Sequence, residues 1–229
     1  IEVKINIYEG EKISVEKINI IGNSVTDESV IRAELLIDEG DPFNKLKLDK
    51  SIAKIKSRNL FSKVKENTKN GTEKNQKIID IEVEEKPTGE ISAGAGIGTE
   101  GGSFAFSVTE NNWLGKGINV ASSIDVSKTT LTGNIQVTNP NYNYSGNSLS
   151  YFLSNSTNDK VDSGFKNKLT TIGIGTSFEQ YRNVYLSPKI SYAYDDLVVN
   201  SSLFFKHSFI RTKDLGHKIW NCEHQICVK

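Results

Sequence analysis

An alternation of apolar and polar residues with a period of two runs from Glu90 to about residue 195. Such a pattern places successive side chains on opposite faces of a β-strand. We predict seven strands of about nine or ten residues, the length that a tilted strand needs to cross a bilayer. The apolar members of this pattern include Ile91, Ala93, Ala95, Ile97, Phe104, Phe106, Val108, Ile124, Ile135, Leu153, Ile172, Ile174 and Ile190.

The connections between these strands distinguish a membrane barrel from a soluble sandwich. The second, fourth and sixth predicted turns span 111–117, 139–147 and 179–183. The other turns are poor in aromatic residues and include a long polar stretch over 155–168. Aromatic residues at one rim and polar loops at the other are typical of outer-membrane barrels, so we predict an antiparallel transmembrane β-barrel and keep a β-sandwich as the alternative. The predicted aromatic girdle consists of Trp113, Tyr142, Tyr144, Tyr181 and Tyr185.

The first 88 residues have a different composition. They hold 33 of the 56 charged residues but only four of the 18 glycines. A domain boundary is therefore predicted at Lys86-Pro87-Thr88-Gly89, where proline and glycine break regular structure. Residues 1–10 contain one alternating strand, which we assign to the end of a preceding unit.

Residues 11–86 predict an α+β module with the order strand, two helices, two strands. The first strand carries Val15, Ile18 and Ile20, whose broken phase predicts a β-bulge. A helix is expected to begin near Glu28 and to end before Gly40. A second helix follows from the spacing of Leu48, Ile52 and Ile55, and two strands begin near Phe61 and Ile79. The open edges of such a small sheet suit the binding of extended chains by strand addition.

Charge and hydropathy exclude several classes of function. With 28 basic and 28 acidic residues the formal net charge is zero, which argues against a nucleic-acid binder. No window approaches the roughly 18 apolar residues of a membrane-spanning helix. The module has no His or Cys, and we interpret its acids as solvated charge, so no enzyme is predicted.

Because the chain begins with Ile1, we expect it to be part of a longer protein.

A glycine-rich segment matches the dinucleotide-binding pattern GxGxxG over residues 96–101. That fingerprint requires a helix next, whose first amides bind the pyrophosphate. Residues 103–108 alternate instead, so we predict a hairpin turn without a bound cofactor.

The C-terminal segment, residues 201–229, differs from the rest and is predicted not to be native barrel. It holds all three His and both Cys residues. The spacing of His217, Cys222, His224 and Cys227 is a weak zinc signal, and a disulfide between the two Cys stays open. We predict no metal site here.

Three short motifs resemble those of the BamA family of outer-membrane protein assembly factors, also described as POTRA-plus-barrel surface antigens. Gly94-Ala95-Gly96-Ile97-Gly98-Thr99-Glu100 is similar to the family's first barrel strand. Residues 112–117, NWLGKG, resemble its second turn, and residues 137–140, VTNP, resemble the end of its fourth strand. The resemblance implies the end of one POTRA domain at 1–10, the last POTRA domain at 11–86 and the N-terminal barrel strands at 89–195. Seven strands leave two open edges, so no closed barrel is expected from these residues alone.

The resemblance also implies a function and a location. Members of the family assemble and insert β-barrel proteins into the outer membrane without nucleotide or metal, with POTRA domains in the periplasm. The implied partners are unfolded outer-membrane proteins, a BamD-like lipoprotein, other subunits of the assembly complex and outer-membrane lipid, with no nucleic acid. Glu39 resembles the family position that contacts the lipoprotein. Incoming strands are expected to pair along a weak seam formed by Ile91, Ser92, Ala93, Gly94, Ala95, Gly96, Ile97 and Gly98.

Two other functions stay open. One is a POTRA-barrel transporter that secretes a partner protein, and the other is a soluble secreted binding protein built on a β-sandwich. The turn motifs around Trp113 and Asn139 favour the assembly factor over the transporter.

Overall fold

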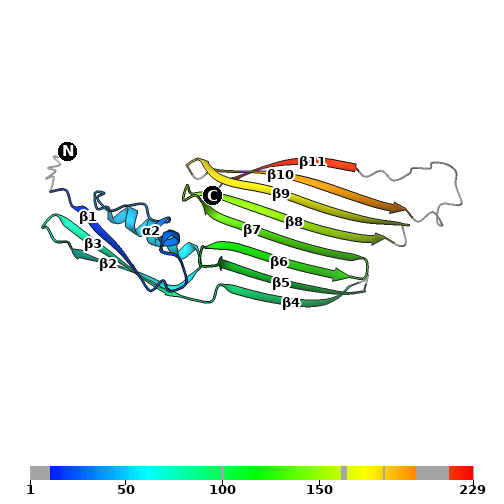
Figure 1. Cartoon of the computed structure of the whole chain (residues 1–229), viewed down its shortest axis with the longest axis horizontal. Coiled ribbons are helices and arrows are strands. Elements are labelled where there is room, and N and C mark those ends of the chain that lie inside the picture. The colour runs from blue at the N-terminus through cyan, green and yellow to red at the C-terminus, as the bar shows by residue number, and fades with distance from the viewer. Residues whose placement is uncertain (1–10, 99–100, 161–163, 183, 200–216, 229) are drawn as a thin grey trace, which may run out of the picture. The chain divides into compact units, whose positions relative to one another are not determined.

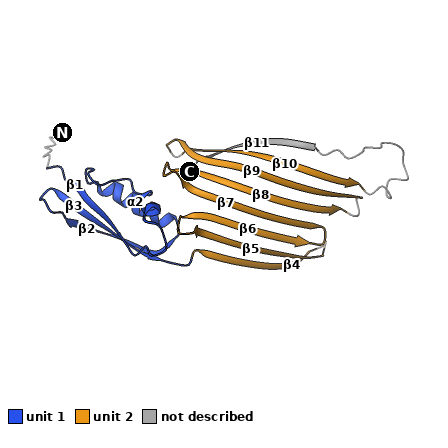
Figure 2. Ribbon diagram, viewed as in Figure 1, with its two compact units in different colours: residues 1–87 blue, residues 88–229 orange. Residues whose placement is uncertain are grey.

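The chain divides into two compact units, residues 1–87 and 88–229 (Figures 1 and 2). The computed structural model describes residues 11–98, 101–160, 164–182 and 184–199, together with the backbone of 217–228. The strand predicted within residues 1–10 lies outside this range. No helix among the described residues is long and apolar enough to span a membrane.

Unit 1 contains a three-stranded sheet and two helices in the predicted order. The sheet order is β1-β3-β2, with β3 in the centre, parallel to β1 and antiparallel to β2. A register shift between Val15 and Lys17 confirms the predicted bulge. The elements are β1 (Ser14–Ile21), α1 (Glu28–Arg32), α2 (Lys45–Ser57), β2 (Phe61–Asn70) and β3 (Gln76–Glu85).

The core of unit 1 is one buried cluster to which the apolar positions of α2 and β3 both contribute. Leu48, Ile52 and Ile55 are buried on one side of α2, as their helical spacing predicts. Ile79 and Ile81 are completely buried on β3. At the start of α2, the Asn44 side chain accepts a hydrogen bond from the Lys47 amide at 3.1 Å, which satisfies one of the free first-turn donors.

Two expectations for unit 1 are corrected. The first helix begins at Glu28, as predicted, but ends at Arg32 because the next turns form tighter i to i+3 bonds and the Leu36 amide donates to Ser51 Oγ instead. The acids are also not all solvated. Asp80 is 5% exposed because Asn19 Nδ2 and Lys69 Nζ cover it at 2.8 and 2.7 Å, and these bonds lower its pKa.

Unit 2 is a single antiparallel sheet in which each strand pairs with the next along the chain. Figure 1 shows the strands side by side from β4 to β11. They are β4 (Gly89–Gly98), β5 (Gly101–Trp113), β6 (Ile118–Ser127), β7 (Thr130–Tyr142), β8 (Asn147–Lys160), β9 (Phe165–Tyr181), β10 (Val184–Val199) and β11 (His217–Val228).

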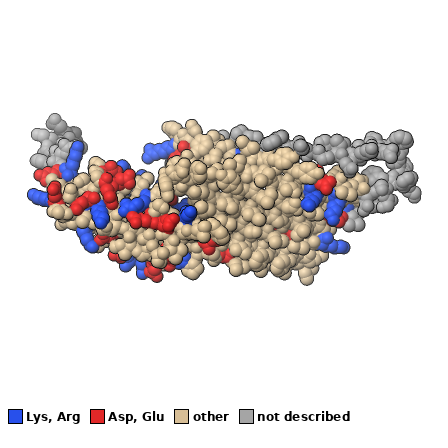
Figure 3. Space-filling view, in the orientation of Figure 1, with Lys and Arg blue, Asp and Glu red and all other residues tan. Residues whose placement is uncertain are grey.

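The apolar residues of unit 2 share one face of this sheet, because they are paired across strands. Phe104 pairs with Val126, and Ile174 pairs with Ile190. These side chains stay exposed: Phe104 keeps 50% of its surface and Ile172 keeps 57%. Figure 3 shows a wide uncharged area over the middle of the strands. A sandwich would cover such a face with a second sheet, and none does so among the described residues, so the sandwich alternative is wrong for this fold.

Three expectations for unit 2 differ from the structure. Most of the long polar loop predicted over 155–168 is strand, because β8 continues to Lys160 and β9 begins at Phe165. β8 and β9 are consequently longer than predicted, with 14 and 17 residues, whereas β4 and β6 have the predicted ten. The backbone of residues 217–228 pairs with β10 as an eighth strand, β11, where the sequence predicted seven.

Candidate functional site

The first strand of unit 2, β4, lies at an edge of the sheet and pairs with β5 alone. Its other edge has no partner strand among the described residues. All ten of its residues are exposed, and Ile97 keeps 96% of its surface. An unpaired edge presents a row of backbone donors and acceptors to any extended chain that approaches it. β4 is therefore the segment of unit 2 best placed to accept another strand.

One face of β4 consists of very small residues. Ser92, Gly94, Gly96 and Gly98 alternate along it, and they lie opposite small residues of β5. A Cβ atom built on Gly94 or Gly98 would meet nothing within 4 Å. Side chains thus contribute little to the pairing of β4 with β5 at these positions, and the backbone ladder holds the two strands together.

A shallow recess of about 350 Å³ lies over this face. The residues that line it include Gly94 and Gly96 of β4 and Asp125 of β6. The recess exists because glycine leaves the sheet surface uncovered. It gives room for the side chains of a strand that approaches the edge.

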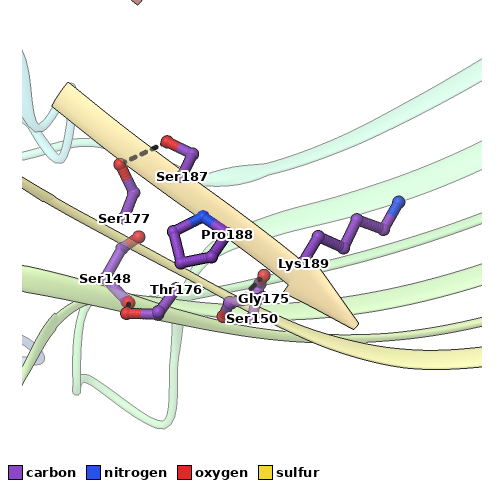
Figure 4. Close-up of a pocket in the computed structure, with 8 residues that line it drawn as sticks. All are labelled: Ser148, Ser150, Gly175, Thr176, Ser177, Ser187, Pro188 and Lys189. Carbon is purple, nitrogen blue, oxygen red and sulfur yellow. Dashed lines mark hydrogen bonds between the residues drawn. The ribbon is translucent and has the colours of Figure 1, made fainter. Parts of the chain in front are cut away.

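A second recess of about 200 Å³ lies among β8, β9 and β10 (Figure 4). Its hydroxyls are already bonded: Ser187 donates to Ser177 at 2.8 Å, and Ser150 donates to the Gly175 carbonyl at 3.2 Å. Lys189 extends away from these serines and places its Nζ 3.9 Å from the centre of the Phe152 ring. No residue that lines the recess is a His, Cys, Asp or Glu, the side chains that usually bind metals.

The GxGxxG segment is not a phosphate-binding loop. Gly98 pairs with Gly101, and the strand β5 follows where the fingerprint requires a helix. The predicted hairpin is confirmed by this pairing.

Glu39, the predicted lipoprotein contact, is bonded within unit 1. Its Oε1 accepts from the Ile18 amide at 3.0 Å and lies 3.7 Å from Arg32 Nη1. The Gly40 amide donates to the Val15 carbonyl next to it. Residues 39–43 therefore close the outer edge of β1, while 45% of the Glu39 side chain stays exposed.

The five aromatic residues of the predicted girdle gather at one end of the sheet. They lie in or beside the β5–β6, β7–β8 and β9–β10 turns, and β4 begins at the same end because Gly89 pairs with Glu110. Trp113, Tyr142, Tyr144 and Tyr181 are exposed, and Tyr185 is partly exposed.

Comparisons with known proteins agree with this architecture. Residues 13–86 match the POTRA family, described as surface antigen variable number repeat. BamA of Neisseria meningitidis serogroup B is 29% identical over 180 residues, which are 76% of this chain and 23% of that protein. BamA of Neorickettsia risticii is 32% identical over 118 residues, which are 50% of this chain and 16% of that protein. The chain is BamA-like: a POTRA domain followed by barrel strands.

The similarity to BamA extends to three dimensions. The crystal structure of BamA from Haemophilus ducreyi lacking POTRA domains 1–3 superposes with a TM-score of 0.72, at 20% identity, over 95% of this chain and 43% of that one. CdiB from Escherichia coli superposes less well, with a TM-score of 0.65 at 15% identity, over 94% of this chain and 41% of that one. At these identities both comparisons show a likeness of fold.

The BamA relatives also fix the location of the two units. They are outer-membrane proteins, so the strands of unit 2 belong to the outer membrane and the POTRA domain to the periplasm. The chain spans less than a quarter of the length of the two BamA sequences.

Proposed function

We propose that this chain assembles and inserts β-barrel proteins into the outer membrane, and that β4 is where an incoming strand pairs. The single observation that carries the proposal is an exposed, glycine-rich edge strand held by one neighbour. The relatives are named outer-membrane protein assembly factors, which supports the same function. No enzymatic step is needed, because a strand that pairs with β4 gains its stabilisation from backbone hydrogen bonds.

The bilayer makes this pairing energetically favourable. An unsatisfied backbone amide or carbonyl in lipid costs several kcal/mol. A free edge of a membrane sheet and an unfolded substrate strand both carry such groups, so pairing them removes both costs. The substrates are accordingly unfolded outer-membrane proteins with an extended amphipathic strand, and residues 91–98 form the seam that receives it.

Further partners are proposed from the same relationship. They are a BamD-like lipoprotein at Glu39, other subunits of the assembly complex, and lipid around the aromatic girdle. Among the described residues of the POTRA sheet, β2 pairs only with β3, whereas residues 39–43 close the edge of β1. The β2 edge is therefore the more accessible place for an extended chain to add to this domain.

Substitution of Gly94 by valine tests the role of the seam. A Cβ atom built on Gly94 meets nothing within 4 Å, so we expect the substitution to leave the fold intact. A β-branched residue nevertheless stiffens the strand and covers the face that the incoming strand approaches. We expect G94V and G96V to reduce the assembly of a reporter barrel several-fold in vesicles that contain the purified complex.

Gly133 on β7 provides the matched control. It also has nothing within 4 Å of a built Cβ atom, but it lies in the interior of the sheet. G133V should leave reporter assembly near the wild-type rate. Unchanged assembly in G94V and G96V would remove β4 from the mechanism.

A POTRA-barrel transporter is the second candidate, and the similarity to CdiB structures fits it, though less closely than BamA fits the first. Release of a secreted partner that depends on this chain, without any effect on reporter barrels, would favour the transporter.

A further inference from the structure

Two turns at the same end of the sheet have the same pattern of hydrogen bonds. In the β5–β6 turn, Asn112 Oδ1 accepts from the Gly117 amide at 2.8 Å, and in the β7–β8 turn Asn141 Oδ1 accepts from the Gly146 amide at 2.8 Å. Both glycines adopt positive φ angles, +62° and +77°, that let the chain fold back to the asparagine. The pairing register shifts just before each turn.

The residue two positions before each asparagine also has the same role. Glu110 Oε1 accepts from the Asn112 amide at 2.7 Å, and Asn139 Oδ1 accepts from the Asn141 amide at 3.1 Å. Either a glutamate or an asparagine can therefore accept the hydrogen bond from the turn amide. The turn alone does not explain why the first turn has the longer, charged glutamate.

That explanation is Thr88, the residue that precedes β4. Thr88 Oγ1 donates to Glu110 Oε1. The Thr88 carbonyl accepts from both the backbone amide and the Nδ2 of Asn111, at 3.2 and 3.1 Å. Asn119 Nδ2 in turn donates to Asn111 Oδ1 at 2.5 Å. At the position of Asn111 the second turn has Pro140, which has no amide hydrogen to donate.

We call the hydrogen bonds of Thr88 with Glu110 and Asn111 the Thr88 anchor. The opposite end of β4 differs from it. Across Gly94–Gly98, the described residues show pairing to β5 but no side-chain hydrogen bond. One end of the edge strand is thus held by side chains and the other by the backbone ladder alone.

We propose that the Thr88 anchor fixes the start of β4 on β5, so that the edge strand loosens only from its Gly98 end and presents its free edge to an incoming strand in one register. Glu110 and Asn111 are then positioning residues for the proposed strand pairing, on which this inference rests. Because side chains alternate with a period of two, a slip of one residue would turn the apolar face of an incoming strand toward the wrong side. The anchor prevents such a slip by holding the phase of β4 at Thr88.

Hydrogen exchange of β4 amides in the full-length protein in detergent tests the anchor without any substrate. In the wild type, residues 94–98 should exchange at least about tenfold faster than residues 89–91. E110A should abolish this difference by accelerating exchange at 89–91. E110Q keeps an Oε1 acceptor and should retain the protection.

T88V is a second variant, in case E110A fails to fold. It replaces only the Thr88 hydroxyl, which removes the hydrogen bond to Glu110, and it should also accelerate exchange at 89–91. N139A alters the second turn in the same way as E110A alters the first, and should leave β4 unchanged. Uniform exchange along wild-type β4, or unaltered protection at 89–91 in both E110A and T88V, would overturn the anchor.

The assembly reaction separates this inference from the function on which it rests. A substrate strand disulfide-linked to β4 cysteine positions should form one register in the wild type and a spread of registers in E110A. Failure of the wild type to assemble any reporter would overturn the proposed function, whereas a single register in E110A would overturn the anchor alone.

Discussion

At the scale of single residues, Glu85 at the end of β3 accepts hydrogen bonds from three successive residues of the loop before α1. It accepts from Ser24 Oγ at 2.7 Å, from the Val25 amide at 3.0 Å and from the Thr26 amide at 2.7 Å. Burial alone would raise the pKa of Glu85, but these hydrogen bonds outweigh it and lower the pKa to about 2. Glu85 thereby fixes the loop that leads into α1.

This pKa predicts a dependence of stability on pH. The folded pKa lies below the ordinary value of 4.5, so the stabilisation is fully present above pH 4.5 and is lost as the pH falls toward 2. We expect E85Q to lower the free energy of unfolding of a fragment spanning residues 11–87 by about 2 kcal/mol at pH 7, after allowance for solvent screening. Urea titrations between pH 2 and 7 should show a flatter profile for E85Q. The neighbouring exposed E84Q serves as control, and equal profiles for E85Q and wild type would refute the assignment.

Glu39 combines a local bond with a proposed partner contact, and two substitutions separate these roles. E39A leaves the Ile18 amide without its acceptor and should destabilise the domain by about 1 kcal/mol. E39Q keeps an acceptor but removes the charge, so it should preserve stability and weaken binding of the lipoprotein. Calorimetric titration measures that affinity, and equal affinities for E39Q and wild type would show that the charge of Glu39 has no role in binding.

At the scale of elements, the contact of β8, β9 and β10 depends on Gly173. A Cβ atom there would lie 2.2 Å from Phe152 Cζ and 2.7 Å from the Ile190 carbonyl oxygen. The Phe152 ring can move, but the backbone carbonyl of β10 cannot do so without disturbing the ladder. The ring of Phe152 consequently occupies the place that a side chain on residue 173 would need.

We therefore expect G173A to destabilise the barrel by about 1 to 3 kcal/mol, the usual cost of overpacking. G133A on β7 should cost much less, because nothing lies within 4 Å of its built Cβ atom. Denaturant unfolding of the protein in detergent compares the two variants. Similar midpoints for G173A and G133A would mean that the β9–β10 contact adapts freely.

The elements also show which strands the sequence patterns predict and which they miss. The alternation of Ile79, Ile81 and Val83 predicts β3, and the broken phase after Val15 predicts the bulge in β1, because both patterns depend only on which side chains are buried. The predicted lengths of β8 and β9 are wrong, since polar residues within 155–168 continue the ladder without apolar alternation. Around β11, a spacing of two from Trp220 to Val228 is interrupted by His224, which hides the strand.

The Thr88 anchor was missed for a different reason. Its members are a threonine, a glutamate and an asparagine, residue types that are ordinary in turns. Only the bulge after Glu110, which turns Asn111 back toward Thr88, brings them together. Neither residue spacing nor composition carries that information.

At the scale of the whole molecule, the two units bury apolar surface in different ways. The POTRA domain encloses its apolar residues in a core, whereas unit 2 exposes them on one face of a sheet. The exposed face suits lipid, and the exposed edge at β4 suits another strand. Each described unit thus fits the environment that the BamA relatives indicate, periplasm for the first and outer membrane for the second.

The pairing of substrate with β4 is the central claim, and site-specific photo-crosslinking during assembly of a reporter barrel tests it most directly. A photoreactive residue at Ile97 on β4 is compared with one at Leu131 on β7, since both side chains are exposed. The account predicts adducts between the terminal strand of the reporter and position 97, and none at position 131. Equal adducts at both positions, or none at position 97 while assembly proceeds, would contradict it.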